Sequence, residues 1–332
     1  MTGLLGHPAA QFVIHYVLPT TITITVVMTS IAYITLAERK VIGWMQDRYG
    51  PNRVGPFGLL QPLADGLKFI MKRDLMPQGA EVLAFQMAPV LSLIPALGAF
   101  AVIPFGPSFQ IVPLDIGLLY ILALSSLGVY GIVLAGWSSA NKWSMLGSLR
   151  ASAQMISYEL AMGLALLSVV TEAGSLGLRD IAAAQQGRVW FVVPQILGYF
   201  VFIVAGIAEL NRAPFDMAEA ESELVAGYHT EYSGMKFAMF FMAEYANMIV
   251  LGLVGACLYL GGWSGPALPL LNPASSGAVW VVGKAFAYVF CMLWLRATMP
   301  RFRYDQLMGF GWKILVPLGL VNFLITAVRV VL

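Results

Sequence analysis

Long apolar runs without charge, separated by short polar segments, dominate the hydrophobic pattern of this 332-residue chain. No Asp, Glu, Lys or Arg precedes Glu38, and residues 82–114 and 245–283 also lack all four. A helix needs about 20 apolar residues to cross a hydrocarbon core roughly 30 Å thick. Runs this long and continuous do not alternate as the strands of a membrane barrel do. The pattern therefore predicts an all-α polytopic membrane protein.

We predict a bundle of eight transmembrane helices in a single membrane domain, 1–332. The expected spans cover about 13–37, 82–104, 114–136, 153–171, 189–210, 235–260, 278–298 and 310–331. Turn residues such as those at 104–107 separate most spans. Prolines inside spans, such as Pro194 and Pro317, are expected to kink helices that their neighbours then support.

A segment between the first two spans has a different pattern. Within 57–72, apolar residues recur at helical spacing opposite polar residues. This pattern predicts an amphipathic helix that lies in the membrane interface. The pattern alone leaves open whether the helix is only a surface anchor or has a function.

The loop at 211–234 holds the densest acidic cluster of the chain, and we expect it to be partly helical. If 216–225 forms a helix, Asp216, Glu219 and Glu223 share one face, and Glu221 points elsewhere. A solvated acidic surface is the usual explanation of such a cluster. The loop is also rich in apolar residues, which indicates that it packs against another part of the protein.

Basic residues are concentrated in alternate loops. The odd-numbered loops hold 15 of the 19 Lys and Arg residues. Basic loops remain on the cytoplasmic side of a membrane, so we expect both termini on the opposite, periplasmic side. Lys284, near the outer end of the seventh span, is expected to extend to the surface.

The composition excludes several classes of protein. Hydrophobic residues make up 59% of the chain and charged residues 11%, against about 25% charged in soluble domains, which excludes an ordinary soluble or a disordered protein. Two cysteines cannot supply the four thiolates of an iron–sulfur cluster, and three scattered histidines are too few for a haem pair or a zinc site. We therefore expect no redox centre and no metal in this chain.

Three acids lie within or at the end of predicted spans, namely Glu159, Glu209 and Glu244. A carboxylate in the middle of a bilayer costs roughly 2.5–3.5 kcal/mol on insertion scales. Buried acids can take up and release protons near neutral pH, as a proton relay requires. A basic partner on another helix, or a place near a helix end, is the alternative explanation, especially for Glu209.

The first loop contains a rigid basic segment at 48–56, rich in glycine and proline, with Arg48 and Arg53. Glu38, Arg39 and Lys40 lie where the first span meets the interface. Basic groups at this place could dock a partner subunit, polarise a substrate carbonyl, or only follow the bias toward basic cytoplasmic loops.

Several long motifs resemble one family between about residues 34 and 320. They are Glu38-Arg39-Lys40 with Gly43, Gly50-Pro51-Asn52-Arg53-Val54-Gly55-Pro56, Leu60-Gln61-Pro62-Leu63-Ala64-Asp65, Gly136-Trp137, Ala153-Gln154, Ser157-Tyr158-Glu159, the block 208–216, the block 219–225 and the block 300–308. The chain resembles the H-type membrane component of bacterial respiratory complex I, which is NADH dehydrogenase subunit 1 in mitochondria. We see no departure at a position that the family uses for chemistry.

The resemblance implies a membrane subunit of a proton-pumping NADH:quinone oxidoreductase. Such proteins anchor the hydrophilic arm, form the entrance and part of the tunnel for quinone, and start an acidic relay toward the proton pumps. Quinone is then a substrate, and flavin and iron–sulfur clusters belong to partner subunits. The implied location is the bacterial inner membrane, or the mitochondrial inner membrane for an organellar protein.

The resemblance also implies roles for single residues. For quinone binding they are Glu38, Arg39, Asp65, Phe215 and Phe241. For the proton relay they are Glu159, Glu209, Asp216, Glu219, Glu221, Glu223 and Glu244. For charge tuning or docking they are Arg48, Arg53, Arg212, Arg296, Arg301 and Arg303. The implied partners are the quinone-site and iron–sulfur subunits, the small and antiporter-like membrane subunits and lipids, with no nucleic acid.

Three alternatives remain from the sequence. A related subunit of a hydrogenase or another ferredoxin-linked complex would share many motifs, although the first-loop block favours the quinone-linked enzyme. A separate ion-coupled transporter is disfavoured because the chain shows no internal repeat. A purely structural anchor leaves Glu159 and Glu244 unexplained.

Overall fold

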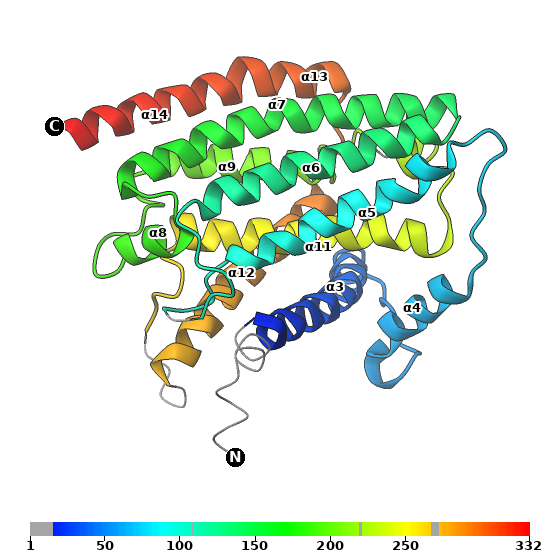
Figure 1. Ribbon diagram of the computed structural model, residues 1–332, viewed down its shortest axis with the longest axis horizontal. Helices are drawn as coiled ribbons and strands as arrows, with labels where there is room; N and C mark the ends of the chain where they lie inside the picture. The colour runs from blue at the N-terminus through cyan, green and yellow to red at the C-terminus, as the bar shows by residue number, and fades with distance from the viewer. Residues whose placement is uncertain (1–15, 108, 219–220, 267–271) are drawn as a thin grey trace.

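The computed structural model describes residues 16–107, 109–218, 221–266 and 272–332. Within these residues all regular structure is helical (Figure 1). The longer helices are α3 Leu18–Met45, α4 Gln61–Met71, α5 Val82–Gly98, α6 Gly117–Ser138, α7 Lys142–Ala173, α9 Ile196–Glu209, α11 Gly234–Tyr259, α12 Pro273–Thr298 and α14 Val316–Val331. Shorter elements are α8 Leu178–Ala184, α10 Glu221–Leu224, α13 Tyr304–Phe310 and the single turns Pro56–Gly58, Ala99–Val102, Gly227–His229 and Gly311–Leu315.

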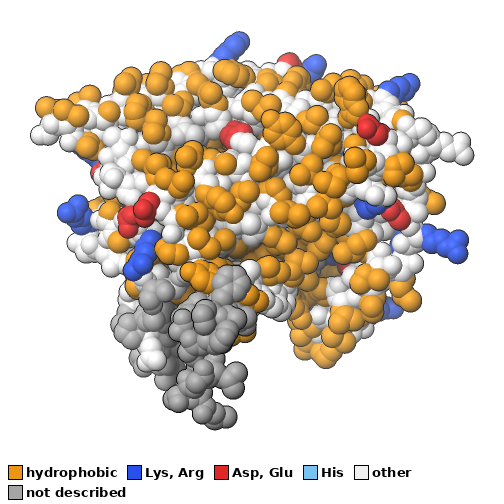
Figure 2. Space-filling view, viewed as in Figure 1, with side chains coloured by type: hydrophobic (Ala, Val, Ile, Leu, Met, Phe, Trp, Pro, Cys, Tyr) orange, Lys and Arg blue, Asp and Glu red, His pale blue; other side chains and the backbone are white. Residues whose placement is uncertain are grey.

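Seven helices in the described ranges are long and apolar enough to cross a membrane: α3, α5 with the turn after it, α6, α7, α11, α12, and α13 to α14 taken together. The all-α membrane fold predicted from the sequence is therefore confirmed. Figure 2 shows the broad face of the bundle covered by apolar side chains, with charged groups mainly toward its two ends and one acidic side chain near the middle.

The predicted span 189–210 is shorter than expected as a helix. Residues 191–195, which include Pro194, form turns, and α9 has only 14 residues. At 1.5 Å per residue such a helix is about 21 Å long, less than the hydrocarbon core. Its start is held by the buried side chain of Gln195, which donates to Glu172 of α7 at 2.9 Å and to Thr326 of α14 at 2.8 Å.

Two other helices extend beyond the expected spans because a charged residue ends a hydrophobic run but does not end a helix. Helix α3 continues to Met45, so Glu38 and its basic neighbours are helical. Helix α7 begins at Lys142 and not near 153, because the side chain of Asn141 accepts a hydrogen bond from the backbone N–H of Trp143 and caps the helix.

Helix α7 lies at the centre of one half of the bundle, against α6, α9 and α14, and α11 packs against α5 and α12. Helices α3 and α4 lie together below α11 in Figure 1, at the edge of the bundle. The predicted amphipathic helix is shorter than 57–72 and has no buried residue. Leu63, Leu67, Ile70 and Met71 face outward from this chain, whereas Phe69 contacts Phe237 of α11.

The acidic loop is partly helical, as α10 and the turn Gly227–His229. The helix begins only at Glu221, so Asp216 precedes it and does not share a helix face with Glu223. Glu219 lies outside the described residues, as does the side chain of Glu221.

The expectation that Lys284 extends to the surface is wrong. Its ammonium group donates to the backbone oxygens of Leu260, Gly262 and Ser264 at 2.6–2.8 Å. These carbonyls follow the C-terminal end of α11, where a cation is favoured by the free carbonyls and the helix dipole. Lys284 thus fixes the turn after α11.

Candidate functional site

A network of charged side chains joins four segments at the end of the bundle that carries the first and fifth loops, which we call the basic end. Arg212, in the turn after α9, donates to Glu38 of α3 at 2.7 Å and to Glu244 of α11. Arg296 of α12 donates to the other oxygen of Glu38. The hydroxyl of Tyr245 donates to Glu38 at 2.8 Å, and its ring lies 4.2 Å from the Arg212 guanidinium.

Glu38 reaches this network because it continues the buried stripe of α3. The buried residues Val27, Ile31, Ile34 and Glu38 follow one another at intervals of four, three and four. That spacing keeps them on one helix face. The hydrophobic pattern therefore carried a signal that Glu38 points into the bundle, although its charge suggested the interface.

Arg212 hydrogen-bonds both carboxylates, and the charge of Arg296 also acts on both. Burial lowers the pKa of its guanidinium, but the charges of Glu244, Tyr245 and Glu38 outweigh burial and raise that pKa well above its usual value. Removing one partner of a buried ion pair costs about 3–5 kcal/mol, because the remaining charge stays buried. Loss of Arg212 would leave Glu244 without its ion-pair partner, whereas Glu38 would keep Arg296 and Tyr245.

On one side of the network, Glu38 borders a pocket of about 420 Å³ between α3 and the first loop. Arg39, Ile42 and residues 48–51 line the rest of this pocket. Asp65 of α4 does not line the pocket but is bound to one of its residues, because its carboxylate accepts a hydrogen bond from Arg39 at 2.7 Å. Three residues of the predicted quinone site, Glu38, Arg39 and Asp65, are thus connected.

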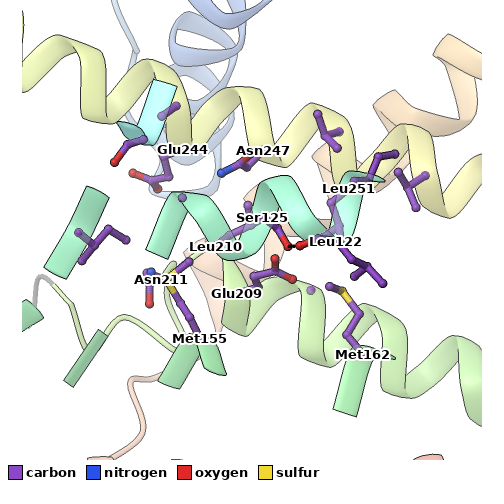
Figure 3. A pocket seen from close by; sticks show the side chains of 18 of the residues that line it. Leu122, Ser125, Met155, Met162, Glu209, Leu210, Asn211, Glu244, Asn247 and Leu251 are labelled. Carbon is purple, nitrogen blue, oxygen red and sulfur yellow. Dashed lines mark hydrogen bonds between the residues drawn. The ribbon is translucent and has the colours of Figure 1, made fainter. Parts of the chain in front are cut away.

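On the other side, Glu244 borders a cavity of about 100 Å³ inside the bundle, which continues past Asn247 to Glu209 (Figure 3). Most of its wall is apolar. Three buried oxygens in the wall have no hydrogen-bond partner among the described residues: Ser92 Oγ, Glu209 Oε2 and Asn211 Oδ1. A cavity of this size has room for a few water molecules, and water at these three oxygens would satisfy them.

Glu159 of α7 lies beyond this cavity and is held by a hydrogen bond from Ser126 of α6. Its charge interacts with Glu209. The structure therefore brings the three predicted intramembrane acids into one connected region, with Glu244 nearest the basic end.

Three acids of the fifth loop whose side chains the structure describes are paired with residues outside the loop. Asp216 is buried and accepts from Arg301 at 2.8 Å, and Glu223 pairs with Arg150 of α7 at 2.6 Å. Glu231 accepts from Asn141 at 2.6 Å. These contacts attach the loop to the ends of α7 and α12. The three described acids are therefore not part of a freely solvated surface.

Other predicted site residues lie apart from the two cavities. Phe215 stacks on Phe302 with ring centres 5.6 Å apart and also contacts Tyr158. Phe241 stacks beside His229 and Phe237. Neither Phe215 nor Phe241 lines the pocket at Glu38 or the cavity at Glu244.

The predicted docking arginines of the surface differ in their contacts. Arg48 lines the pocket at Glu38 and donates to Gln46 at 2.8 Å. Arg53 is exposed on the first loop, and Arg303 is 80% exposed beside Asp305. These groups are available to a partner at the basic end.

Sequence reasoning missed the neutral polar residues of the cavity. Asn211, Asn247, Ser92 and Ser125 line it, and Ser126 holds Glu159. Asn247 follows Glu244 at a spacing of three on an otherwise apolar helix, so its place on the same face was readable from the sequence. No group of three or more His, Cys, Asp or Glu side chains in the described ranges is placed to hold a metal ion.

Known proteins resemble this chain over almost its whole length. The family model described as NADH dehydrogenase matches residues 18–327. The second H-type subunit of NADH-quinone oxidoreductase from Koribacter versatilis is 49% identical, with 97% of this chain and 99% of the relative aligned. The H-type subunit from Syntrophotalea carbinolica is 56% identical and the first of those from Geobacter metallireducens 53% identical, each with 91% of this chain and 92% of the relative aligned.

Proposed function

The chain belongs to the NADH dehydrogenase family as a membrane subunit of NADH-quinone oxidoreductase, and on that premise we propose that it binds quinone at the basic end and passes the effect of quinone reduction to a proton relay. The observation that carries the proposal is the Arg212 bridge. It connects Glu38, at the pocket beside the first loop, with Glu244, at the cavity inside the membrane.

For the quinone side, the pocket at Glu38 is joined to α4 by the hydrogen bond from Arg39 to Asp65, and α4 carries an outward apolar surface. Leu63, Leu67 and Ile70 of α4 are each more than half exposed. A lipid-soluble quinone would pass along such an apolar surface and meet Arg39 and Asp65 at its inner end. A guanidinium there can donate to a quinone carbonyl, which attracts electron density as it is reduced.

For the proton side, Glu244, Glu209 and Glu159 form a series of acids separated by short gaps. Water in the cavity would connect Glu244 to Glu209, and electrostatic interaction joins Glu209 to Glu159. Asn247, Asn211 and Ser125 would hold that water in place. The other relay candidates, Asp216 and Glu223, are paired with arginines, so they fit a flanking role that fixes the loop.

The coupling step follows from the charge balance around Arg212. Reduction of a quinone to a quinol consumes two electrons and two protons, and transient negative charge near Glu38 competes for the two arginines that bind it. If Arg212 turns toward that charge, Glu244 loses its partner. A buried carboxylate without a partner gains a proton. Glu244 would take this proton through the cavity water from Glu209, which would leave Glu209 to take up the next proton of the series.

The proposal includes the surroundings of the chain. The basic end would face the cytoplasm in the bacterial inner membrane and dock the hydrophilic arm through Arg53, Arg301 and Arg303. Flavin and iron–sulfur clusters would then be held by partner subunits, and the other membrane subunits would continue the relay. The names of the relatives favour this enzyme over a hydrogenase-linked complex or a separate transporter.

The proposal is tested by comparing Arg39→Ala with Glu209→Gln in the whole complex, reconstituted in liposomes. Arg39→Ala should raise the KM for quinone several-fold and leave NADH oxidation by an artificial acceptor unchanged. Glu209→Gln, which keeps size and hydrogen bonding but cannot ionise, should keep quinone reduction and lower the pH gradient formed per NADH.

Lys142→Ala is a matched control at the start of α7, where the side chain lies over Trp143 and away from both cavities. It should behave as the wild type in all three assays. An unchanged pH gradient per NADH in Glu209→Gln contradicts the relay. Equal loss of quinone reduction and artificial-acceptor activity in Arg39→Ala indicates an assembly role and contradicts the quinone site.

A further inference from the structure

Four aromatic rings lie between the cavity and the outer end of the bundle, which is the end opposite the basic end. They are Tyr199 and Phe202 of α9, Tyr259 of α11 and Tyr288 of α12, and we call them the aromatic plug. The ring of Phe202 lies 5.3 Å from that of Tyr259 and 6.3 Å from that of Tyr288, between ring centres. Tyr199 contacts both tyrosines at 5.2 and 6.1 Å.

The plug borders the cavity through one of its rings, Phe202, and Leu118 and Leu166 also line this end of the cavity. Phe202 lines the cavity and is fully buried, as is Tyr259. Phe202 precedes Glu209 by seven residues on α9, which is about 10 Å along the helix axis. The rings therefore occupy the next layer of the bundle beyond the last acid of the cavity.

The rings fit closely against α11. A Cβ atom added at Gly255 would lie 2.7 Å from Cζ of Tyr288 and 2.9 Å from Cε1 of Phe202. The hydroxyl of Tyr259 donates to the backbone oxygen of Ala165 in α7 at 3.3 Å. The plug thus spans four helices, and glycine at 255 leaves the space that two of its rings fill.

The outer side of the plug is fixed by buried polar groups. The amide oxygen of Gln185 accepts from the backbone N–H of Phe191 at 3.1 Å and of Gly261 at 3.0 Å. The backbone N–H of Val192 donates to the carbonyl of Tyr259 at 2.9 Å. With the three carbonyl contacts of Lys284, these bonds hold the turn after Tyr259 in one position.

We propose that the aromatic plug closes the outer end of the cavity to protons, so that the relay acids exchange protons at the basic end and within the membrane but not with the outer aqueous phase. This inference rests on the proposed relay, since the plug insulates that path. A proton that crosses this layer must leave its water and meets only three tyrosine hydroxyls as polar groups, and an isolated charge in such surroundings is very costly. Without this layer, the acids would dissipate the gradient that the complex builds.

The test measures passive proton conductance of the whole complex in liposomes, without NADH, as the decay of an imposed pH gradient in the presence of valinomycin and potassium. Phe202→Ala removes a ring from α9, and Tyr288→Ala removes a ring from α12. Each variant should speed the decay of the pH gradient at least about tenfold, which corresponds to a barrier lower by about 1.4 kcal/mol. Phe286→Ala, on the exposed face of α12, is the matched control and should decay as the wild type.

Decay at the wild-type rate in both ring variants overturns the plug, and so does equally fast decay in the Phe286→Ala control. If truncation to Ala prevents assembly, Phe202→Leu and Gly255→Ala, which disturb the same layer with smaller changes in volume, are measured in the same way and judged by the same criterion. Failure of the proposed relay is a separate result. It would be seen as an unchanged pH gradient per NADH in Glu209→Gln, a measurement that does not depend on passive proton conductance.

Discussion

His229 is a titratable ring buried in a stack of aromatic side chains beside α11. Its ring centre lies 5.0 Å from that of Tyr228 and 5.2 Å from that of Phe237, and Nδ1 lies 2.7 Å from the backbone oxygen of Ala226. A carbonyl accepts only, so Nδ1 carries the proton in the neutral ring. Burial lowers the pKa of His229 to about 4, so the ring is neutral in the folded protein near pH 7.

This burial predicts acid sensitivity. The unfolded chain takes up a proton at His229 near its usual pKa of about 6.5, whereas the folded chain does so near 4. Stability is therefore lost as the pH falls from about 6.5 toward 4, on the order of 2 kcal/mol at pH 5. The melting temperature of the purified complex should fall more between pH 7 and pH 5 in the wild type than in His229→Phe.

His229→Phe keeps an aromatic ring in the stack and removes the titration together with the hydrogen bond to Ala226. The lost hydrogen bond lowers stability equally at both pH values, so the difference between pH 7 and pH 5 reports the titration. Equal loss of melting temperature in both between pH 7 and pH 5 would show that His229 is already protonated in the folded state or does not contribute to acid unfolding.

At the scale of elements, two glycines, Gly43 of α3 and Gly50 of the first loop, let the first loop pack closely against the end of α3. A Cβ atom added at Gly50 would lie 2.9 Å from Cα of Lys40 and 3.1 Å from the backbone oxygen of Arg39. Neither backbone atom can move without shifting the helix. Gly50→Ala should therefore displace the loop, lower thermal stability and raise the KM for quinone several-fold, with NADH oxidation by an artificial acceptor unchanged.

Gly66→Ala is the control for this prediction, because nothing lies within 4 Å of a Cβ atom added at Gly66. Gly66 is inside α4, where Ala is favoured over Gly by about 1 kcal/mol. It should keep the wild-type KM and equal or exceed the wild-type stability. A wild-type KM and melting temperature in Gly50→Ala would mean that the loop accommodates the extra methyl group.

The elements themselves were largely predictable, and the exceptions have identifiable causes. Hydrophobic length located the long spans, since each apolar run must cover the hydrocarbon core. Hydrophobic length placed the start of α9 wrongly, because the apolar sequence around Pro194 forms turns, which the buried side chain of Gln195 stabilises. It also placed the start of α7 too late, because polar residues at 142–152 contact other parts of the protein and not lipid.

At the scale of the whole molecule, the orientation in the membrane is open to a direct test. Gln78 is exposed on the loop after α4 at the basic end, and Arg188 is exposed between α8 and α9 at the outer end. Since basic loops face the cytoplasm, Gln78→Cys should react with a membrane-impermeant maleimide only in inverted vesicles, and Arg188→Cys only in right-side-out vesicles.

The background for this labelling carries Cys291→Ser, because Cys291 is exposed, and keeps Cys257, which is buried. Detergent-treated vesicles give the full labelling of each site as the reference. The opposite pattern would place the basic end outside the cell and would contradict the proposed side for the hydrophilic arm.

The sequence by itself determined the membrane class, most of the spans and the family, because these depend on local hydrophobic length and on motifs that are continuous in the chain. It also identified Glu159, Glu209 and Glu244 as acids in an apolar setting. The tertiary structure alone decided which charges meet. Glu38 pairs with Arg212 and Arg296, which are 174 and 258 residues away, and only helix packing brings such groups together. The cavity and the aromatic plug depend on the same packing, since each is built from side chains of several helices that no local pattern relates.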